Sequence, residues 1–280
     1  MRRSHGLGMS SNLYPTPWGE PELALTAQAG IAYLELWASP LDCLPDPPAL
    51  ERLGATAQAL GLHVWSLHAP YGEACNLASA DETGRGLAVS TLVAAMDRAR
   101  AAGASLVVVH SGLLAHPREP REPAVARAVR SLNELCQPAS ERGLALAVEY
   151  LPPGTLALGA GTEELLSLRS LVDGEIGFCA DVVHMHPAED PATVIRALGG
   201  AVATVHLSDN DGVEVERHWL PGKGQIKWPA VLSALDEVGY QGPMLVEAHT
   251  GYEPDLPRVL AALAACGHEV LGCQLPDAPG

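Results

Sequence analysis

LALAVEY, residues 144–150, is an apolar run that ends in a carboxylate, and three later segments of the chain repeat this design. They are IGFCADVVH (176–184), AVATVHLSD (201–209) and GPMLVEAH (242–249). Short strands that are apolar almost throughout are typical of a parallel sheet buried on both faces. Each run also follows a stretch with helical periodicity. The four segments therefore predict parallel strands with a polar group at each C-terminal end, namely Glu149, Asp181, His206 and Glu247.

The same alternation extends over the chain and gives eight strand–helix units. Strands are expected within 5–11, 31–38, 62–71, 104–112, 144–150, 175–184, 201–209 and 242–249. Helices are expected within 21–30, 48–61, 84–103, 124–143, 162–172, 191–200, 228–240 and 255–267. Eight units predict an α/β fold, a single (β/α)8 TIM barrel in one domain over residues 1–280. An open doubly wound sheet is the alternative, but no glycine-rich phosphate turn follows the first strand.

Glycines punctuate this pattern. Five of them stand directly before an expected strand: Gly61, Gly103, Gly143, Gly174 and Gly239. Glycine is the usual residue just past a helix C-terminus, where the backbone turns left-handed. We therefore expect a left-handed backbone at all five.

The composition is that of a folded protein, with 48% hydrophobic and 18% charged residues. No apolar run follows the N-terminal arginines, and no stretch approaches the ~20 apolar residues that span a bilayer. We therefore expect a cytoplasmic protein with no membrane partner. The six cysteines have no metal-type spacing and are expected to be reduced. A net charge of −16, with only two lysines, repels polyanions and argues against nucleic acid as a partner.

The C-terminal ends of all strands meet at one rim of a (β/α)8 barrel, so the polar strand ends predict one shared site. A buried carboxylate is costly unless it is paired or bound to metal, which makes Glu149 a candidate ligand. Asp181, His206 and Glu247 are the other candidates. We expect one divalent ion (Mn, Zn, Co or Mg), and the imidazole favours the transition metals over Mg.

The two glutamates also suggest a reaction. Glu149 and Glu247 would face each other across a closed barrel. One can remove a proton from a sugar carbon while the other returns it, with the metal polarising the carbonyl and stabilising the enediolate. The sequence thus predicts acid–base catalysis by these two residues.

Further polar residues stand near the same rim. His68 and His110 end earlier strands, and His184 follows Asp181 by three residues; we expect all three to line the site and bind substrate. In the loop after the seventh strand, Arg217 could hold a phosphate or sugar hydroxyls, or lie solvated at the surface. Asp209 could orient a ligand histidine or cap a turn.

With these residues in hand, the chain resembles the xylose isomerase-like TIM-barrel superfamily, which contains sugar isomerases and epimerases as well as endonuclease IV. The resemblance runs over nearly the whole chain, from HAPY (68–71) and CNLAS (75–79) to LVEAH (245–249). The epimerase branch implies a single divalent metal held by the four strand-end residues, with the two glutamates as the acid–base pair.

The endonuclease IV branch implies three zinc ions and additional ligands. Their positions fall on His68, His110, His184, Glu216 and His218. Glu216 departs from the family, which has aspartate there, and this puts the third metal position in doubt. Fifteen arginines and two lysines are scattered without a basic run, so there is little provision for a phosphate backbone.

The sequence therefore favours a divalent-metal-dependent isomerase or epimerase that acts on a small sugar or sugar derivative. A zinc-dependent phosphodiester hydrolase of the endonuclease IV type is the main alternative, with up to three metal ions. A sugar or polyol dehydratase and a barrel that binds sugar without turnover are further alternatives. Barrels of this kind often self-associate, so a homo-oligomer is also considered.

Overall fold

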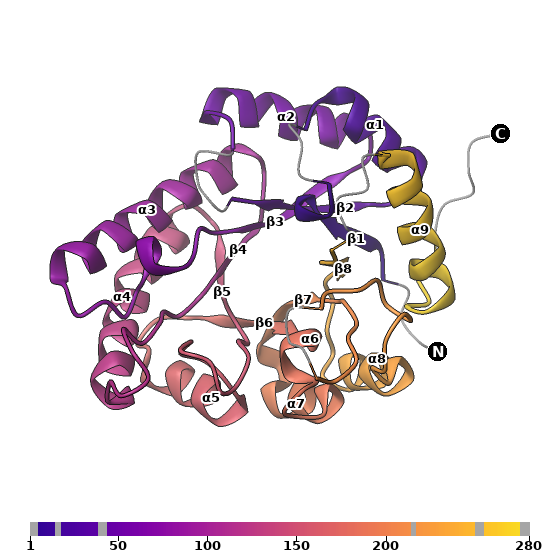
Figure 1. Cartoon of the computed structure of the whole chain (residues 1–280). Coiled ribbons are helices and arrows are strands. Elements are labelled where there is room, and N and C mark those ends of the chain that lie inside the picture. Colours follow the sequence, from indigo (N-terminus) through magenta and orange to yellow (C-terminus); the bar gives the residue numbers. More distant parts are fainter. Residues whose placement is uncertain (1–4, 15–17, 39–43, 214–216, 250–254, 275–280) are drawn as a thin grey trace.

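The computed structural model of the protein describes residues 5–14, 18–38, 44–213, 217–249 and 255–274. Eight strands form one sheet in the order β7-β6-β5-β4-β3-β2-β1-β8. They are β1 (Leu7–Ser10), β2 (Tyr33–Trp37), β3 (His63–His68), β4 (Leu106–Val109), β5 (Ala145–Glu149), β6 (Gly177–Asp181), β7 (Val202–His206) and β8 (Met244–Val246). All neighbouring strands pair in parallel. A parallel bridge between Leu207 and Val246 brings β8 against the end of β7 and closes the ring, as Figure 1 shows.

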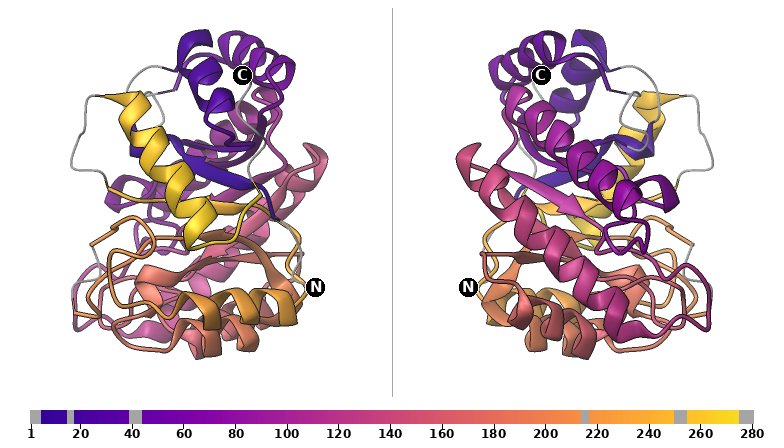
Figure 2. Two further views of the ribbon diagram at one scale, coloured as in Figure 1. Left: turned by 90° about the vertical axis from the view of Figure 1, so that its right-hand side faces the viewer. Right: turned by 90° about the vertical axis from the view of Figure 1, so that its left-hand side faces the viewer.

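Helices follow the strands, and all of them except the short α6 at the end of β6 surround this ring on the outside (Figures 1 and 2). They are α1 (Glu20–Gln28), α2 (Pro47–Ala59), α3 (Glu82–Ala101), α4 (Arg121–Glu141), α5 (Thr162–Leu171), α6 (Val182–Met185), α7 (Pro191–Leu198), α8 (Trp228–Glu237) and α9 (Leu256–Glu269). Short 3-10 turns occur at Ser11–Leu13, Glu73–Cys75 and Gly199–Ala201. The predicted TIM barrel is confirmed, and α6 is an addition to the eight expected helices. In the part of the chain that is described, no helix is long and apolar enough to cross a membrane.

Aspartates start many of these helices. Five of them accept backbone N–H groups of a first turn: Asp46, Asp81, Asp181, Asp190 and Asp255. Such caps satisfy donors that have no partner within the helix. Asp181 differs from the other four because it is also a strand-end residue, so one side chain links the end of β6 to the start of α6.

Glycines end several helices as expected, with one exception. The φ angles of Gly61, Gly103, Gly143 and Gly239 are 79°, 81°, 68° and 74°. The expectation is wrong at Gly174, which is not in the left-handed region. A Cβ at this position would lie 2.5 Å from Cys136 Sγ, so close packing is the reason for glycine there.

The strand alternation separates an apolar layer from the polar rim. Val108, Ala147 and Cys179 belong to one small buried cluster inside the barrel. Each stands two residues before a polar strand-end residue and so points to the same side of the sheet. The polar groups therefore lie on top of a packed apolar layer, at the C-terminal rim of the barrel.

Candidate metal centre

Four strand-end side chains converge at the rim. Glu149, Asp181, His206 and Glu247 can each offer one ligand atom, and these atoms all lie within 4.8 Å of one another. Their exposed fractions are 1%, 0%, 0% and 7%. They come from β5, β6 and β7 and from the position directly after β8. The structure therefore brings together the four residues that the sequence analysis selected as ligands.

Asp181 is oriented by the helix that it caps. Its Oδ1 accepts hydrogen bonds from the backbone N–H groups of Val183 (2.9 Å) and His184 (3.1 Å). Its Oδ2 is buried and has no hydrogen-bond partner among the described residues. This second oxygen lies 3.9 Å from His206 Nδ1. One oxygen of the carboxylate is thus committed to the backbone, and the other is directed into the site.

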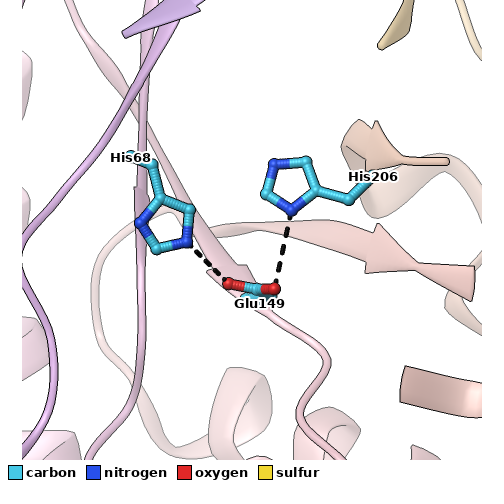
Figure 3. Close-up of side chains that lie close together, drawn as sticks. All are labelled: His68, Glu149 and His206. Carbon is cyan, nitrogen blue, oxygen red and sulfur yellow. Dashed lines mark hydrogen bonds and ion pairs between the residues drawn. The ribbon is translucent and has the colours of Figure 1, made fainter. Parts of the chain in front are cut away.

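Glu149 lies between histidines on both sides. Its Oε2 is 3.0 Å from His68 Nε2 and 2.9 Å from His110 Nε2. Its Oε1 is 3.5 Å from His206 Nδ1, and Figure 3 shows the carboxylate between the rings of His68 and His206. His184 Nδ1 lies 3.4 Å from the same Oε1. The carboxylate of Glu149 therefore faces two separate groups of nitrogen atoms.

A divalent metal fits this donor set. His206 Nδ1 lies 2.9 Å from Glu247 Oε2, yet it is buried without a hydrogen-bond partner of suitable geometry among the described residues. Asp181 Oδ2 is in the same situation. Buried polar atoms are normally satisfied, so two such atoms directed at one point indicate a ligand between them. Three carboxylates and one imidazole suit Mn, Zn or Co.

The charged groups of the site shift one another's pKa values. Burial opposes ionisation of Glu149 and Glu247, but the neighbouring histidines outweigh it and lower both pKa values. Burial likewise disfavours the cation of His68, but Glu149 and other carboxylates outweigh it and raise its pKa to about 9. For Asp181, burial outweighs the attraction of nearby histidines, so its pKa is raised. Asp181 is therefore the candidate ligand whose negative charge is least compensated by the protein itself.

The remaining predicted histidines lie around the same space. A cavity of about 350 Å³ opens onto the site, and its walls include His68, His110, His184, His218 and His249. The rings of His184 and His218 are 5.3 Å apart. Tyr71 stacks on His110 at 4.4 Å and forms one wall. The predicted substrate-binding histidines thus border one cavity together with Glu149 and Glu247.

Two residues of the loop after β7 take other positions. Arg217 lies over the ring of Trp219 at 5.4 Å, with its Nε 3.5 Å from Asp211 Oδ2, and is not among the residues that line the cavity. Its role in substrate binding stays a prediction. Glu216, a candidate for an additional metal, lies outside the described residues.

Asp209 organises this loop rather than a ligand histidine. Its Oδ2 accepts from Gly222 N and Trp228 Nε1, both at 2.9 Å. Its Oδ1 accepts from Ile226 N at 3.1 Å. Of the two interpretations left open by the sequence, the turn-forming one fits these contacts. Because Asp209 also pairs with Trp219 through the backbone, it holds the segment that carries His218.

Glu35, in the middle of β2, was not anticipated. It is fully buried, and its Oε2 accepts from Ser66 Oγ at 2.8 Å and lies 3.2 Å from His206 Nε2. The predicted ligands all stand at strand ends, whereas Glu35 stands between apolar neighbours in YLELW (33–37). A single carboxylate inside an apolar strand was the available signal.

Glu189 connects loops next to Glu149 through hydrogen bonds, and we expect its replacement to lower the free energy of unfolding. Its carboxylate accepts from Tyr150 Oη (2.6 Å), Thr162 N (3.0 Å) and Thr162 Oγ1 (2.7 Å). Glu189→Ala leaves the hydroxyl of buried Tyr150 without this partner and should cost about 1.5–3 kcal/mol of unfolding free energy. Urea unfolding at pH 7 measures this, with exposed Glu163→Ala as the control, expected within about 0.5 kcal/mol of wild type.

The pH dependence of the unfolding free energy provides a second test of the role of Glu189. Burial would raise the pKa of Glu189, but its hydrogen bonds outweigh burial and lower it. A lowered carboxyl pKa contributes stability that is present above the ordinary value of ~4.3 and is lost as the pH falls through the folded value. The difference in stability between wild type and Glu189→Gln should therefore shrink in acid. An unchanged difference from pH 7 to pH 3 would contradict this account.

The chain is similar in sequence to a known protein family and to several known proteins. The family model described as xylose isomerase-like TIM barrel matches residues 23–266. An uncharacterised protein of Methanocaldococcus jannaschii is 30% identical over 65% of this chain and 63% of its own length, so the match spans less than two thirds of that relative. Fructoselysine 3-epimerase of Escherichia coli O157:H7 is 26% identical over 85% of this chain and 88% of its own. A probable endonuclease 4 of Mycobacterium leprae is 28% identical over 75% and 82%.

Solved structures agree on the fold. D-psicose 3-epimerase with D-tagatose from Clostridium cellulolyticum H10 superposes with a TM-score of 0.82 at 21% identity, covering 96% of this chain and 100% of that one. The IolI protein with a bound zinc atom gives 0.80 at 20% identity, covering 95% and 98%. At these identities the structural likeness shows the fold alone, while the family model covers most of the chain. The chain belongs to the xylose isomerase-like TIM barrel family.

Proposed function

We propose that the protein is a metal-dependent isomerase or epimerase that moves a proton at a carbon next to the carbonyl of a small, unphosphorylated sugar or sugar derivative. One observation carries the proposal: the ligand atoms of Glu149 and Glu247 lie within 4.8 Å of each other and of those of Asp181 and His206, at a cavity of about 350 Å³. The sequence similarity to fructoselysine 3-epimerase supports it.

The chain's own residues divide the work of proton transfer. One glutamate takes the carbon-bound proton from one face of the substrate, and the other returns a proton to the opposite face. Glu149 and Glu247 have lowered pKa values, so the one that acts as the base is ionised at neutral pH, and the other must take up a proton from solvent before it can return one to the carbon. A divalent ion held by Glu149, Asp181, His206 and Glu247 would supply polarisation of the carbonyl. His184 and His218 are positioned at the cavity wall to hydrogen-bond substrate hydroxyls.

The cavity lining supports a neutral substrate. Its polar side chains include histidines and Asn12, and apolar walls come from Tyr71, Leu151 and Leu156. The described residues of this lining include no lysine or arginine, the usual partners of a phosphate group. A sugar with free hydroxyls can meet the imidazoles on one side and the apolar wall on the other. We place this chemistry in cytoplasmic carbohydrate metabolism.

The ligand set also bears on the metal. Carboxylate and imidazole ligands together suit Mn, Zn and Co. The IolI protein, whose structure contains zinc, shares the fold. We propose one such ion at the four strand-end residues.

The test combines metal content with isotope exchange. Protein purified without added metal is analysed for metal per chain, loaded with Mn, Co or Zn, and incubated in D2O with a panel of unphosphorylated ketoses. We expect about one ion per chain and deuterium at the carbon next to the carbonyl of at least one sugar, seen by NMR. Metal-loaded protein that exchanges no sugar proton in the panel, yet cleaves a phosphodiester, would overturn the proposal.

The second candidate is a metal-dependent phosphodiester hydrolase, and one observation favours it. Glu149 Oε2 faces His68 and His110, whereas its Oε1 faces His184 and His206. A carboxylate with nitrogen ligands on both sides can bridge two metal ions, as two-metal hydrolases require. The similarity to probable endonuclease 4 points the same way. Two or three zinc ions per chain and cleavage of DNA at abasic sites would support this alternative.

A further inference from the structure

Glu35 lies beneath the candidate metal centre and is separated from the cavity. Its exposed fraction is 0%, and it is not among the residues that line the cavity. The parallel register of β2 and β3 pairs it with Ser66, whose hydroxyl donates to Oε2 at 2.8 Å. Its Oε1 has no hydrogen-bond partner among the described residues. The charge of Glu35 therefore depends on few contacts, and its bond to His206 is one of them.

A buried carboxylate with so few donors is costly unless further hydrogen-bond donors lie beside it. His206 offers such a donor, because its Nε2 lies 3.2 Å from Glu35 Oε2 across the barrel. The ring of His68 stacks on His206 at 5.7 Å. Glu35 thus acts on the site from the side opposite the substrate.

The bond also decides which nitrogen of His206 can bind metal. Glu35 Oε2 already accepts from Ser66 Oγ, and where it also accepts from His206, Nε2 of the ring carries the hydrogen. In the neutral ring Nδ1 then holds a lone pair. Nδ1 faces Glu247 Oε2 at 2.9 Å and Glu149 Oε1 at 3.5 Å. A lone pair turned toward two carboxylates is favourable when a cation lies between them.

We propose that Glu35 is a positioning residue, which fixes the tautomer and orientation of His206 so that Nδ1 is presented to the metal, and that Ser66 holds Glu35 in place. This inference rests on the metal centre of the proposed function. Groups that orient a metal-bound histidine typically change metal affinity by about 10–100-fold when they are replaced. Glu35 would exert this effect through His206 and without touching substrate.

The experiment measures zinc affinity of the full-length protein by competition with a chromophoric chelator, for wild type, Glu35→Gln, Glu35→Asp and Ser66→Ala. We expect Glu35→Gln to weaken zinc binding about 10–100-fold. Glu35→Asp keeps the charge and should recover part of the loss, and Ser66→Ala should give a smaller loss. NMR of zinc-loaded, 15N-histidine-labelled protein gives a second readout. Wild type should show a protected Nε2–H of His206, and its signal should shift or vanish in Glu35→Gln.

Thr204→Val is the matched control. Thr204 is also fully buried on β7, two residues before His206, and accepts a hydrogen bond from Trp65 Nε1 at 3.1 Å. Its replacement should lower the melting temperature while leaving zinc affinity and the His206 signal unchanged. If Glu35→Gln behaves like Thr204→Val, the inference is overturned and Glu35 is structural only. If wild type itself binds no metal, the metal centre of the proposed function fails with it. Should Glu35→Gln not fold, Glu35→Asp and Ser66→Ala decide the question.

Discussion

Glu149→Gln should abolish epimerisation, with kcat/KM reduced by about 10³-fold or more. An amide cannot take up a proton from carbon, and a positioned general base contributes about 10²–10⁴-fold to such a step. Glu149 is also a candidate ligand, so rates must be expressed per bound metal ion. The measurement follows inversion and deuterium uptake together by proton NMR in D2O, on the sugar identified by the exchange screen.

Glu247→Gln provides the internal comparison. Each of the two variants keeps one carboxylate, so each should still exchange the proton of one epimer while inversion is lost in both. Glu163→Gln makes the same chemical change at an exposed position of α5 and should retain the wild-type rate. If Glu149→Gln inverts the substrate within tenfold of wild type after correction for metal, two-carboxylate catalysis is wrong.

Asp181→Asn should have opposite effects on stability with and without metal. The asparagine oxygen can still cap α6 at Val183 and His184, so the local backbone keeps its bonds. The pKa of Asp181 is raised because burial disfavours its charge, so the ionised group destabilises metal-free protein at neutral pH. Metal-free Asp181→Asn should therefore melt higher than metal-free wild type. This gain should shrink as the pH falls through the raised folded pKa and vanish below ~3.9, where the carboxyl is protonated in both folded and unfolded chains.

Metal binding should reverse the order of the melting temperatures of wild type and Asp181→Asn. At 100 times the dissociation constant a bound ion adds about 2.7 kcal/mol, equivalent to a rise of about 5–10 °C in melting temperature. Wild type should show this rise in calorimetry, and Asp181→Asn little or none. Asp190→Asn is the control, because Asp190 caps α7 in the same manner but is exposed and is not one of the four candidate ligands. Equal metal-induced shifts in wild type and Asp181→Asn would rule Asp181 out as a ligand.

The barrel could be predicted from the sequence because its evidence is local. Each apolar run followed by a helical period is visible without knowledge of distant contacts. The convergence of Glu149, Asp181, His206 and Glu247 then follows from topology alone, since parallel strands of a closed barrel end at one rim. Their roles as ligands and catalysts stay predictions.

The features that could not be predicted from the sequence depend on contacts between elements that are distant in the chain. Glu35 bonds to a histidine 171 positions away, and nothing in YLELW indicates that partner. Gly174 was expected to be left-handed, but its reason is the side chain of Cys136 on another helix. Arg217 stands in a loop, where no periodic pattern specifies a direction, and its contacts are Trp219 and Asp211.

The order of the candidate ligands along the chain has an evolutionary consequence. All four follow residue 144, on consecutive strands β5 to β8, whereas Asn12, Tyr71 and His110 on the cavity wall precede it. Recombination at the turn between α4 and β5 would therefore exchange much of the wall while keeping the candidate metal ligands together. The hydrogen bonds Glu35–His206 and Trp65–Thr204 connect the parts of the barrel before and after this turn. If Glu35 positions His206 as proposed, a new N-terminal half would also need a carboxylate at this place on β2 to keep the metal site intact.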